Sequence, residues 1–400
     1  MGARWLHVIA YGLLGSMSLP IVAADQTPAA SSVKAVINTQ PRILTLSGAW
    51  VDGQVSIASG TVTVAGQAVA LDHLVALEFP GNALPSSIDR AVMLQNGDLI
   101  SGNVESLQSG KLQFISDTLG PISIPIADIR CLTFHPQRLA SIGSGSSTPG
   151  VQLVNGDRIS GKLEWINDEL VGIDTGKRIQ KVPRRSALMW SAAPTAGAAG
   201  QQLVRLVNGD RFSGTVHTLD ADKLQMDIAA VGAATIPANR LCAIWSEGSI
   251  LQPLSTLAPA SSKQVPQFDE SFPPRVDRER SGAFLSCAGH RYERGLACHS
   301  RCELGWDLAG DYASLIGELG IDDLAGERGQ VTITISADGK SVFESGAVRV
   351  GDPPKPVAVS LTGIKRLDLV IDFGPDGSSL GDATDFGWPV LVRAKALPSR

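Results

Sequence analysis

Short runs in which apolar and polar residues alternate recur along most of the chain, interrupted by glycine, proline and serine. Ile100 to Val104, Val331 to Ile335 and Leu367 to Ile371 all show this period of two. A period of two places every second side chain on one face, which is typical of half-buried β-strands. The pattern therefore predicts an all-β protein built from short strands and tight turns.

An internal repeat organises residues 34–250. Strings that begin at Val92, Val151 and Val204 share the pattern apolar-x-Leu-x-Asn-Gly-Asp-x-x-Ser-Gly-x-apolar. A degraded copy precedes them, because Gly48 and Gly53 keep the five-residue interval between the two glycines. Self-similarity of this kind is the signature of a repeat architecture. We therefore expect four repeats, numbered here in chain order: residues 34–80, which are degenerate, then 90–139, 150–190 and 202–250.

The chemistry of the repeated string is structural. Its Asn-Gly pair supplies the positive φ angles of a tight hairpin turn, and Asp98, Asp157 and Asp210 can bond the backbone of that turn. The second glycine, inside a strand pattern, suits a bulge or a sharp bend. Short, bent antiparallel strands close into small barrels. The first half of each repeat also resembles the Sm-like family, which implies tandem small β-barrels of the Sm or SH3-like kind.

The sequence changes character at residues 267–397, after a stretch at 251–266 whose Ser, Ala and Pro content predicts a linker. A motif runs from Tyr292 through Gly295 and His299-Ser300 to Tyr312, and a second match occurs at Asp338-Gly339. This arrangement resembles the NPCBM family of carbohydrate-binding modules. The resemblance implies a galactose-binding-like jelly-roll β-sandwich with a sugar-binding function.

The family's end motif, Asp-His-Ala-Asp-Trp, corresponds to residues 382–386, where alanine replaces the His and phenylalanine replaces the Trp. Trp388 follows two residues later and can supply an aromatic face for a sugar ring. We therefore expect a carbohydrate site formed by His299, Asp385 and Trp388. The alternatives are that His299 is a structural, hydrogen-bonded residue and that Trp388 belongs to the core.

An acidic pair at Asp322 and Asp323 lies in the same module. Carboxylate oxygens are ligands for calcium, so the pair is a weak candidate for a structural calcium site. The alternative is a solvated or turn-capping pair. No other cofactor is expected.

The net charge is −5, from 34 Lys and Arg against 39 Asp and Glu. Binding to a nucleic-acid backbone needs a dense cationic face, so the composition argues against a nucleic-acid partner. One basic run lies in the third repeat, at Lys177, Arg178, Lys181, Arg184 and Arg185. We interpret it as a solvated edge strand protected by charge, the alternative being a patch for acidic glycans or phosphate.

The N-terminus carries an export pattern. Arg4 precedes an apolar stretch from Val8 to Val22, and Val22-Ala23-Ala24 offers small residues before Asp25. This is typical of a secretory signal peptide at residues 1–24. A membrane anchor is the alternative, although the stretch is shorter than the about 20 residues that a span requires. We expect a secreted or periplasmic protein without a transmembrane anchor after cleavage.

Export permits disulfides, and the chain has five cysteines. On one strand, Cys298 and Cys302 would lie too far apart to bridge each other. If either forms a disulfide, Cys287 is the expected partner. The alternative is that all three are buried free thiols.

These observations predict a secreted, non-catalytic protein that binds an extracellular or cell-surface glycan. Gly-x-Ser-x-Gly and His-Glu-x-x-His motifs are absent from the sequence, and repeats occupy the region outside the module. One alternative is an extracellular scaffold that binds other envelope proteins. A second alternative is an accessory subunit of a glycoside hydrolase.

Overall fold

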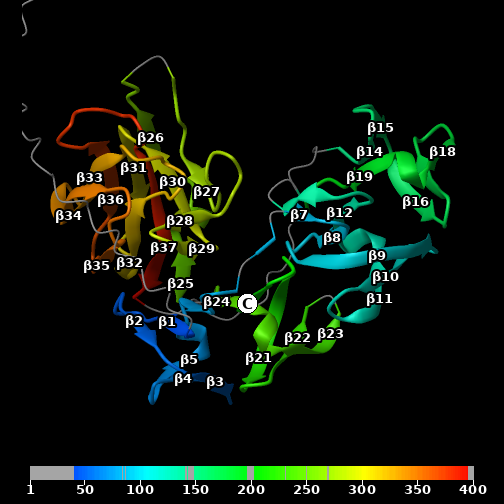
Figure 1. Ribbon diagram of the computed structural model, residues 1–400, viewed down its shortest axis with the longest axis horizontal. Coiled ribbons are helices and arrows are strands. Elements are labelled where there is room, and N and C mark those ends of the chain that lie inside the picture. Colours follow the sequence, from blue (N-terminus) through cyan, green and yellow to red (C-terminus); the bar gives the residue numbers. More distant parts are fainter. Residues whose placement is uncertain are drawn as a thin grey trace, which may run out of the picture. The chain divides into compact units, whose positions relative to one another are not determined.

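Strands dominate the computed structural model, which describes residues 40–394 except 83, 86, 140, 141, 143–147, 196–201, 230, 249, 268 and 269 (Figure 1). Helical structure in this part of the chain consists of 3₁₀ turns of three residues: η1 (Leu71–His73), η2 (Ile126–Asp128), η4 (Arg184–Ser186), η5 (Ala238–Arg240) and η6 (Leu254–Thr256). Within the described ranges, no helix has the length and hydropathy to cross a bilayer. The prediction of an all-β fold is confirmed. The expected signal peptide, residues 1–24, lies outside the described residues.

The four repeats have the same order of elements: antiparallel strands, a 3₁₀ turn and a final strand. The first contains β1 (Arg42–Leu44), β2 (Trp50–Asp52), β3 (Val55–Ala58), β4 (Thr61–Val64), β5 (Gln67–Ala70) and β6 (Ala76–Glu78). The second contains β8 (Ala91–Leu94), β9 (Leu99–Gln108), β10 (Lys111–Ser116), β11 (Gly120–Pro125) and β12 (Ile129–Thr133). The third contains β14 (Gly150–Leu153), β15 (Arg158–Ser160), β16 (Lys162–Ile166), β17 (Leu170–Asp174), β18 (Ile179–Pro183) and β19 (Ala187–Ser191). The fourth contains β20 (Gln202–Leu206), β21 (Arg211–Leu219), β22 (Lys223–Ile228), β23 (Gly232–Pro237) and β24 (Leu241–Ser246).

Each repeat closes because its final strand pairs back with its first, as in β1–β6, β8–β12, β14–β19 and β20–β24. Final strands also pair between repeats: β12 pairs with β19, and β24 pairs with β6. The second repeat is thereby joined to the third, and the first to the fourth. Two short strands flanking the second repeat, β7 (Ser87–Ile88) and β13 (Gln137–Arg138), also pair.

The glycines of the repeated string have the roles that their positions predict. Gly97, Gly156 and Gly209 have φ angles of 88°, 91° and 89°, which a β-branched residue resists. The second glycine allows the bent strand to approach its neighbour. At Gly102 a Cβ atom would lie 2.0 Å from the Ile115 carbonyl oxygen, so no larger residue fits without movement.

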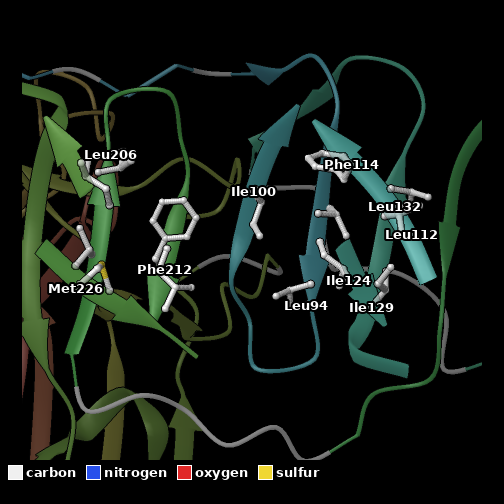
Figure 2. Packing of buried hydrophobic residues seen from close by; sticks show 14 of the residues in the cluster. Leu94, Ile100, Leu112, Phe114, Ile124, Ile129, Leu132, Leu206, Phe212 and Met226 are labelled. Atoms are coloured by element: carbon white, nitrogen blue, oxygen red, sulfur yellow. The ribbon is translucent and has the colours of Figure 1, made fainter. Parts of the chain in front are cut away.

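The repeats share one hydrophobic cluster. The sequence suggested separate barrels, whereas strand pairing between repeats makes their cores continuous. Residues at equivalent positions of the repeats occupy equivalent places in this cluster. Figure 2 shows this for Leu94, Ile100 and Phe114 of the second repeat and for Leu206, Phe212 and Met226 of the fourth.

The C-terminal module is a sandwich of two antiparallel sheets around its own core. The first sheet has the order β27 (Arg275–Val276), β30 (Gly295–His299), β37 (Ala383–Arg393), β32 (Tyr312–Ile321) and β35 (Lys355–Ser360), with β25 (Leu251–Pro253) paired to β37. The second has the order β26 (Ser261–Gln264), β31 (Cys302–Asp307), β36 (Arg366–Phe373), β33 (Gln330–Ala337) and β34 (Lys340–Arg349). A hairpin of β28 (Leu285–Cys287) and β29 (His290–Tyr292) completes the module.

The stretch at 251–266 is not a linker. Its β25 pairs with β37, its β26 pairs with β31, and Leu254 is fully buried in the sandwich core. Serine and proline in this stretch are compatible with edge strands, where unpaired backbone groups face solvent. The module therefore begins near residue 251, before the predicted boundary at residue 267.

Candidate functional site

A pocket of about 640 Å³ opens on the outer face of the first sheet of the module. Leu296 and Phe386 point into the sandwich core, whereas the alternate positions Ala297, His299 and Asp385 line the pocket. Asp385 lies between Ala297 of β30 and Gly320 of β32. The remaining lining residues come from nearby loops and strand ends: Phe272, Pro273, Arg275, Glu279, Arg280, Ser281, Cys298, Asp322, Leu324, Ala325, Gly381 and Ala383.

Two carboxyl groups, of Asp322 and Asp385, lie together at this pocket, and each residue is 1% exposed. The Leu324 N–H donates to Asp322 Oδ1 at 2.6 Å, and the Ser286 N–H donates to Asp385 Oδ2 at 2.9 Å. The two carboxyl groups are close enough to influence each other's ionisation, and two neighbouring buried carboxylates disfavour a charge on both. Burial, and then the Asp322 carboxyl, raise the pKa of Asp385 well above its usual range.

Two oxygens of this carboxyl pair, Asp322 Oδ2 and Asp385 Oδ1, are buried without a hydrogen-bond partner among the described residues. A buried polar atom without a partner costs free energy. Because the pKa of Asp385 is raised, its protonated form is favoured, and a protonated carboxyl can donate as well as accept a hydrogen bond.

One wall of the pocket is aromatic. The rings of Phe272 and His299 stack with centroids 4.1 Å apart and an interplanar angle of 20°. The Arg280 guanidinium lies 4.5 Å from the centre of the Phe272 ring. His299 Nδ1 lies 3.1 Å from the Ser300 carbonyl oxygen, which orients the imidazole. The pocket thus combines a flat apolar wall with hydrogen-bonding groups, the chemistry that recognises a hydroxyl-rich ring.

Comparison with known proteins assigns this part of the chain. Residues 252–392 match the NPCBM/NEW2 domain. The family resemblance of the sequence is therefore confirmed, and the match spans the NPCBM/NEW2 module with its pocket. A curated relative from Renibacterium salmoninarum, named "Putative endo-alpha-N-acetylgalactosaminidase", is 27% identical over 118 residues. That alignment covers 30% of this chain and 7% of the relative, so the chain spans a small part of the relative's length.

Two solved structures from Clostridium perfringens are similar to the chain. A CBM51 module of GH95, in complex with methyl-galactose, is 25% identical; the alignment covers 36% of this chain and 99% of that one, with a TM-score of 0.33. The CBM51-2 and INT domains of ZmpB, in complex with GlcNAc, are 18% identical, with coverages of 48% and 40% and a TM-score of 0.33.

Trp388 is not part of the pocket, and its predicted place beside His299 and Asp385 is corrected. The residue is 1% exposed and its ring lies 5.8 Å from that of Trp245 in the fourth repeat. Its indole N–H donates to Glu78 Oε1 of the first repeat at 2.7 Å. A β-bulge where β32 pairs with β37, together with a φ of 47° at Trp388, directs the ring toward the repeats.

The predicted disulfide of Cys287 is not formed with Cys298 or with Cys302. Cys287 contacts the outer side of the first sheet near Gly320, whereas Cys298 and Cys302 lie in the sandwich core. They belong to β30 and β31 of opposing sheets, so the spacing argument for a single strand does not apply.

The acidic pair at Asp322 and Asp323 is divided between two environments. Asp322 belongs to the pocket, whereas Asp323 Oδ2 accepts a hydrogen bond from the Gly289 N–H at 3.0 Å. The part of the chain that the structure describes holds no group of three or more His, Cys, Asp or Glu side chains arranged around a metal position.

Sequence reasoning did not identify Phe272, Arg275, Glu279 and Arg280 as site residues. They belong to an irregular segment, and most residues of this segment are assigned to no strand. An aromatic ring and several charges close together in a loop were the available signal. Without periodicity, nothing in that segment indicates which face of the module it covers.

Proposed function

We propose that this protein is an exported, non-catalytic glycan-binding protein. Its NPCBM/NEW2 module binds one hydroxyl-rich sugar residue in the pocket lined by Phe272, His299, Asp322 and Asp385. The family match over residues 252–392 supports carbohydrate binding, and the pocket supplies a place for it. The signal-peptide pattern at residues 1–24 supports export, which places the module where glycans of the cell surface occur.

The observation that carries this proposal is the carboxyl pair with two unpartnered oxygens. Sugar hydroxyls are both donors and acceptors, and a carboxyl pair in which Asp385 has a raised pKa offers both complements. The Phe272 ring, half-buried with His299 stacked on it and the Arg280 guanidinium over it, adds an aromatic wall to the same pocket.

The same pair argues against glycoside hydrolysis in this pocket. Hydrolases of most families place two carboxyl groups about 5–9.5 Å apart, on either side of the scissile bond. Asp322 and Asp385 lie beside each other and each is 1% exposed, so the pair does not flank an open space in which a glycosidic bond could lie. The named enzyme among the relatives matches over only 7% of its length, which favours an accessory, module-like role as the second candidate.

The test is a glycan-array screen of the full chain, followed by calorimetric titration of the strongest ligand. Asp322→Ala should weaken binding at least about tenfold, because hydrogen bonds to charged groups contribute about 1.5–3 kcal/mol. Asp323→Ala is the matched control, because it removes the neighbouring carboxyl of Asp323, which does not line the pocket.

Melting curves should be recorded for both variants, so that unfolding is not mistaken for lost binding. Absence of any glycan ligand for the wild-type chain would contradict the proposal. Equal binding by a folded Asp322→Ala variant would place the ligand elsewhere on the protein.

A further inference from the structure

The three Asn-Gly-Asp turns of the repeats have the same internal hydrogen bonds. In the third repeat the Asn155 side-chain amide donates to Asp157 Oδ2 at 2.8 Å, and the Asp157 N–H donates to Asn155 Oδ1 at 3.1 Å. The equivalent bonds occur in the second and fourth repeats. The turn is therefore formed by local sequence and has the same shape whether or not another repeat covers it.

The turns of the second and fourth repeats dock on each other reciprocally. Asn96 Nδ2 donates to Ser213 Oγ at 2.9 Å, and Asn208 Nδ2 donates to Ser101 Oγ at 2.8 Å. Strands β9 and β21 run antiparallel at this contact, with Leu99 opposite Arg211. The asparagine–serine bonds are made from both sides, whereas Arg211 of the fourth repeat faces Leu99 of the second, so the contact is two-fold in its asparagine–serine bonds only.

This contact buries polar groups that need the facing repeat. Asp98 and Asp210 are 0% exposed, and burial raises the pKa of both carboxyls, although Asp210 accepts hydrogen bonds from the Ser101 N–H and from Thr118 Oγ1 of the facing repeat. Arg211 donates through Nε to the Gly97 carbonyl oxygen at 3.0 Å. Because buried polar groups are costly unless paired, these bonds select a partner that carries the same string.

In the first repeat the corresponding turn is covered by the module. A Cβ atom on Gly48 would lie 3.0 Å from Ala358 Cβ and 3.1 Å from the Val357 carbonyl oxygen. Ala49 replaces the aspartate at this turn and is exposed, so it is Gly48 that the module covers. Three of the four turns are thus covered within the chain.

The third repeat keeps the whole string and leaves it uncovered. Asn155, Gly156, Asp157, Arg158 and Ser160 are all exposed. The preceding Val154 is 56% exposed and borders a groove of about 340 Å³. Its final strand, β19, is already paired with β12 and β14, so the contact with the second repeat does not involve this turn.

We propose that the exposed turn of the third repeat binds the same turn of a second copy of this chain. Arg158 occupies the position of Arg211, and Ser160 occupies the positions of Ser101 and Ser213. In the single chain the Arg158 guanidinium donates to the Thr148 carbonyl oxygen at 2.6 Å. In such a dimer each Arg158 exchanges this bond for one to the Gly156 carbonyl of the other copy, and each Asn155 reaches Ser160. Every bond is made twice, because a two-fold interface places the same patch on both sides.

The basic run of the third repeat gives this dimer an unusual salt dependence. In the second and fourth repeats, the hairpins after the turn line one common groove, with Thr118 and Ser123 on one side and Val231 and Thr235 on the other. The equivalent hairpin of the third repeat carries Lys177 and Arg178. Two such hairpins repel each other across a dimer, so added salt should tighten it by screening.

The test measures mass against concentration, by light scattering, for the full chain and two variants. The wild-type chain should dimerise, and Ser160→Lys should be monomeric, because the new side chain fills the position that Asn155 must reach. Ser56→Lys is the matched control: this serine is an exposed strand residue of the first repeat, and the variant should dimerise like the wild type. A monomeric wild type, or a Ser160→Lys variant that still dimerises, would overturn the proposal.

A second variant, Arg158→Ala, tests the dimer independently of whether Ser160→Lys folds. Arg158→Ala should weaken the dimer about a hundredfold, about tenfold for each of the two symmetric charge-assisted bonds. The dimer of the wild-type chain should tighten as sodium chloride is raised. A dimer that Arg158→Ala leaves unchanged uses another surface and contradicts the proposal, as does one that salt weakens.

Discussion

Asp385 and Trp388 stand three residues apart on the same strand and occupy opposite kinds of environment. Asp385 faces an open pocket beside the Phe272–His299 wall. Trp388 is covered by Trp245 and bonded to Glu78, residues more than a hundred positions earlier in the chain. One end of the strand therefore serves a candidate binding site, and the other anchors the module to the repeats. Proximity in sequence did not indicate a shared role.

A bulge at Trp388 explains why its ring leaves the sandwich core. Pairing of β32 with β37 shifts register between Ile316 and Glu318, opposite residues 387–390. An extra residue at such a point reverses which side chains face each sheet surface. Strict alternation from Phe386 would have directed Trp388 into the sandwich core, whereas the bulge directs it toward the repeats.

The largest loss of stability is expected at the end of β37 that the repeats cover. Trp388→Ala should lower the free energy of unfolding by about 3–5 kcal/mol, the range for truncating a buried aromatic side chain. Urea denaturation of the full chain measures this. Leu380→Ala is the control, because Leu380 is 55% exposed at the open end and should change stability by less than about 0.5 kcal/mol. A small loss at Trp388 would mean that the repeats do not cover it in solution.

A smaller loss is expected at the partner of Trp388. Glu78 accepts the Trp388 indole N–H and pairs with Arg42, whose side chain is 9% exposed. Glu78→Gln keeps the acceptor for the indole but removes the charge opposite Arg42, which should cost about 1.5–3 kcal/mol. Glu270→Gln breaks an ion pair with Arg280 in which both side chains are 62% exposed. It should lower the free energy of unfolding only slightly in the same urea assay. Equal effects in the two variants would contradict the buried contact.

The stability that Asp385, at the pocket end of β37, contributes to the fold should depend on pH. Because the pKa of Asp385 is raised in the folded state, folding favours its protonated form. That stabilisation is fully present below the unfolded-state pKa of about 3.9 and is lost as pH rises through the folded-state value. Asp385→Asn, which resembles the protonated carboxyl, should reduce this decline when unfolding is followed across pH. Asp323→Asn should keep the wild-type profile; an unchanged profile in Asp385→Asn would argue against a raised pKa of Asp385 in the folded state.

The smallest change in stability is expected at the aromatic wall. Phe272 is half-buried and contacts His299 and Arg280. Phe272→Ala should cost about 1 kcal/mol of stability or less but weaken glycan binding by about 0.5–1.5 kcal/mol, the contribution of an aromatic contact. Phe272→Tyr keeps the ring and should bind nearly as well. If Phe272→Ala destabilised the fold without weakening glycan binding, the ring would have a structural role only.

Local sequence was most informative where the backbone itself is constrained. The Asn-Gly-Asp turns, the bends at Gly102 and its equivalents, and the strands of the module all follow from turn chemistry and period-two patterning. The family resemblance placed His299 and Asp385, which do line one pocket. It could not place Phe272 or Arg280, because they belong to an irregular loop whose course depends on the module beneath it.

The sequence by itself determined the repeated unit, the identity of the C-terminal module and the conformation of each turn, because these depend on φ preferences and alternation within a few residues. Only the tertiary structure decided which turns are buried, toward which side Trp388 points, and that Asp322 meets Asp385. Those outcomes depend on contacts between segments far apart in the chain. Asp157 and Asp210 illustrate the distinction: they have the same local sequence and the same turn, yet one is exposed and the other is fully buried.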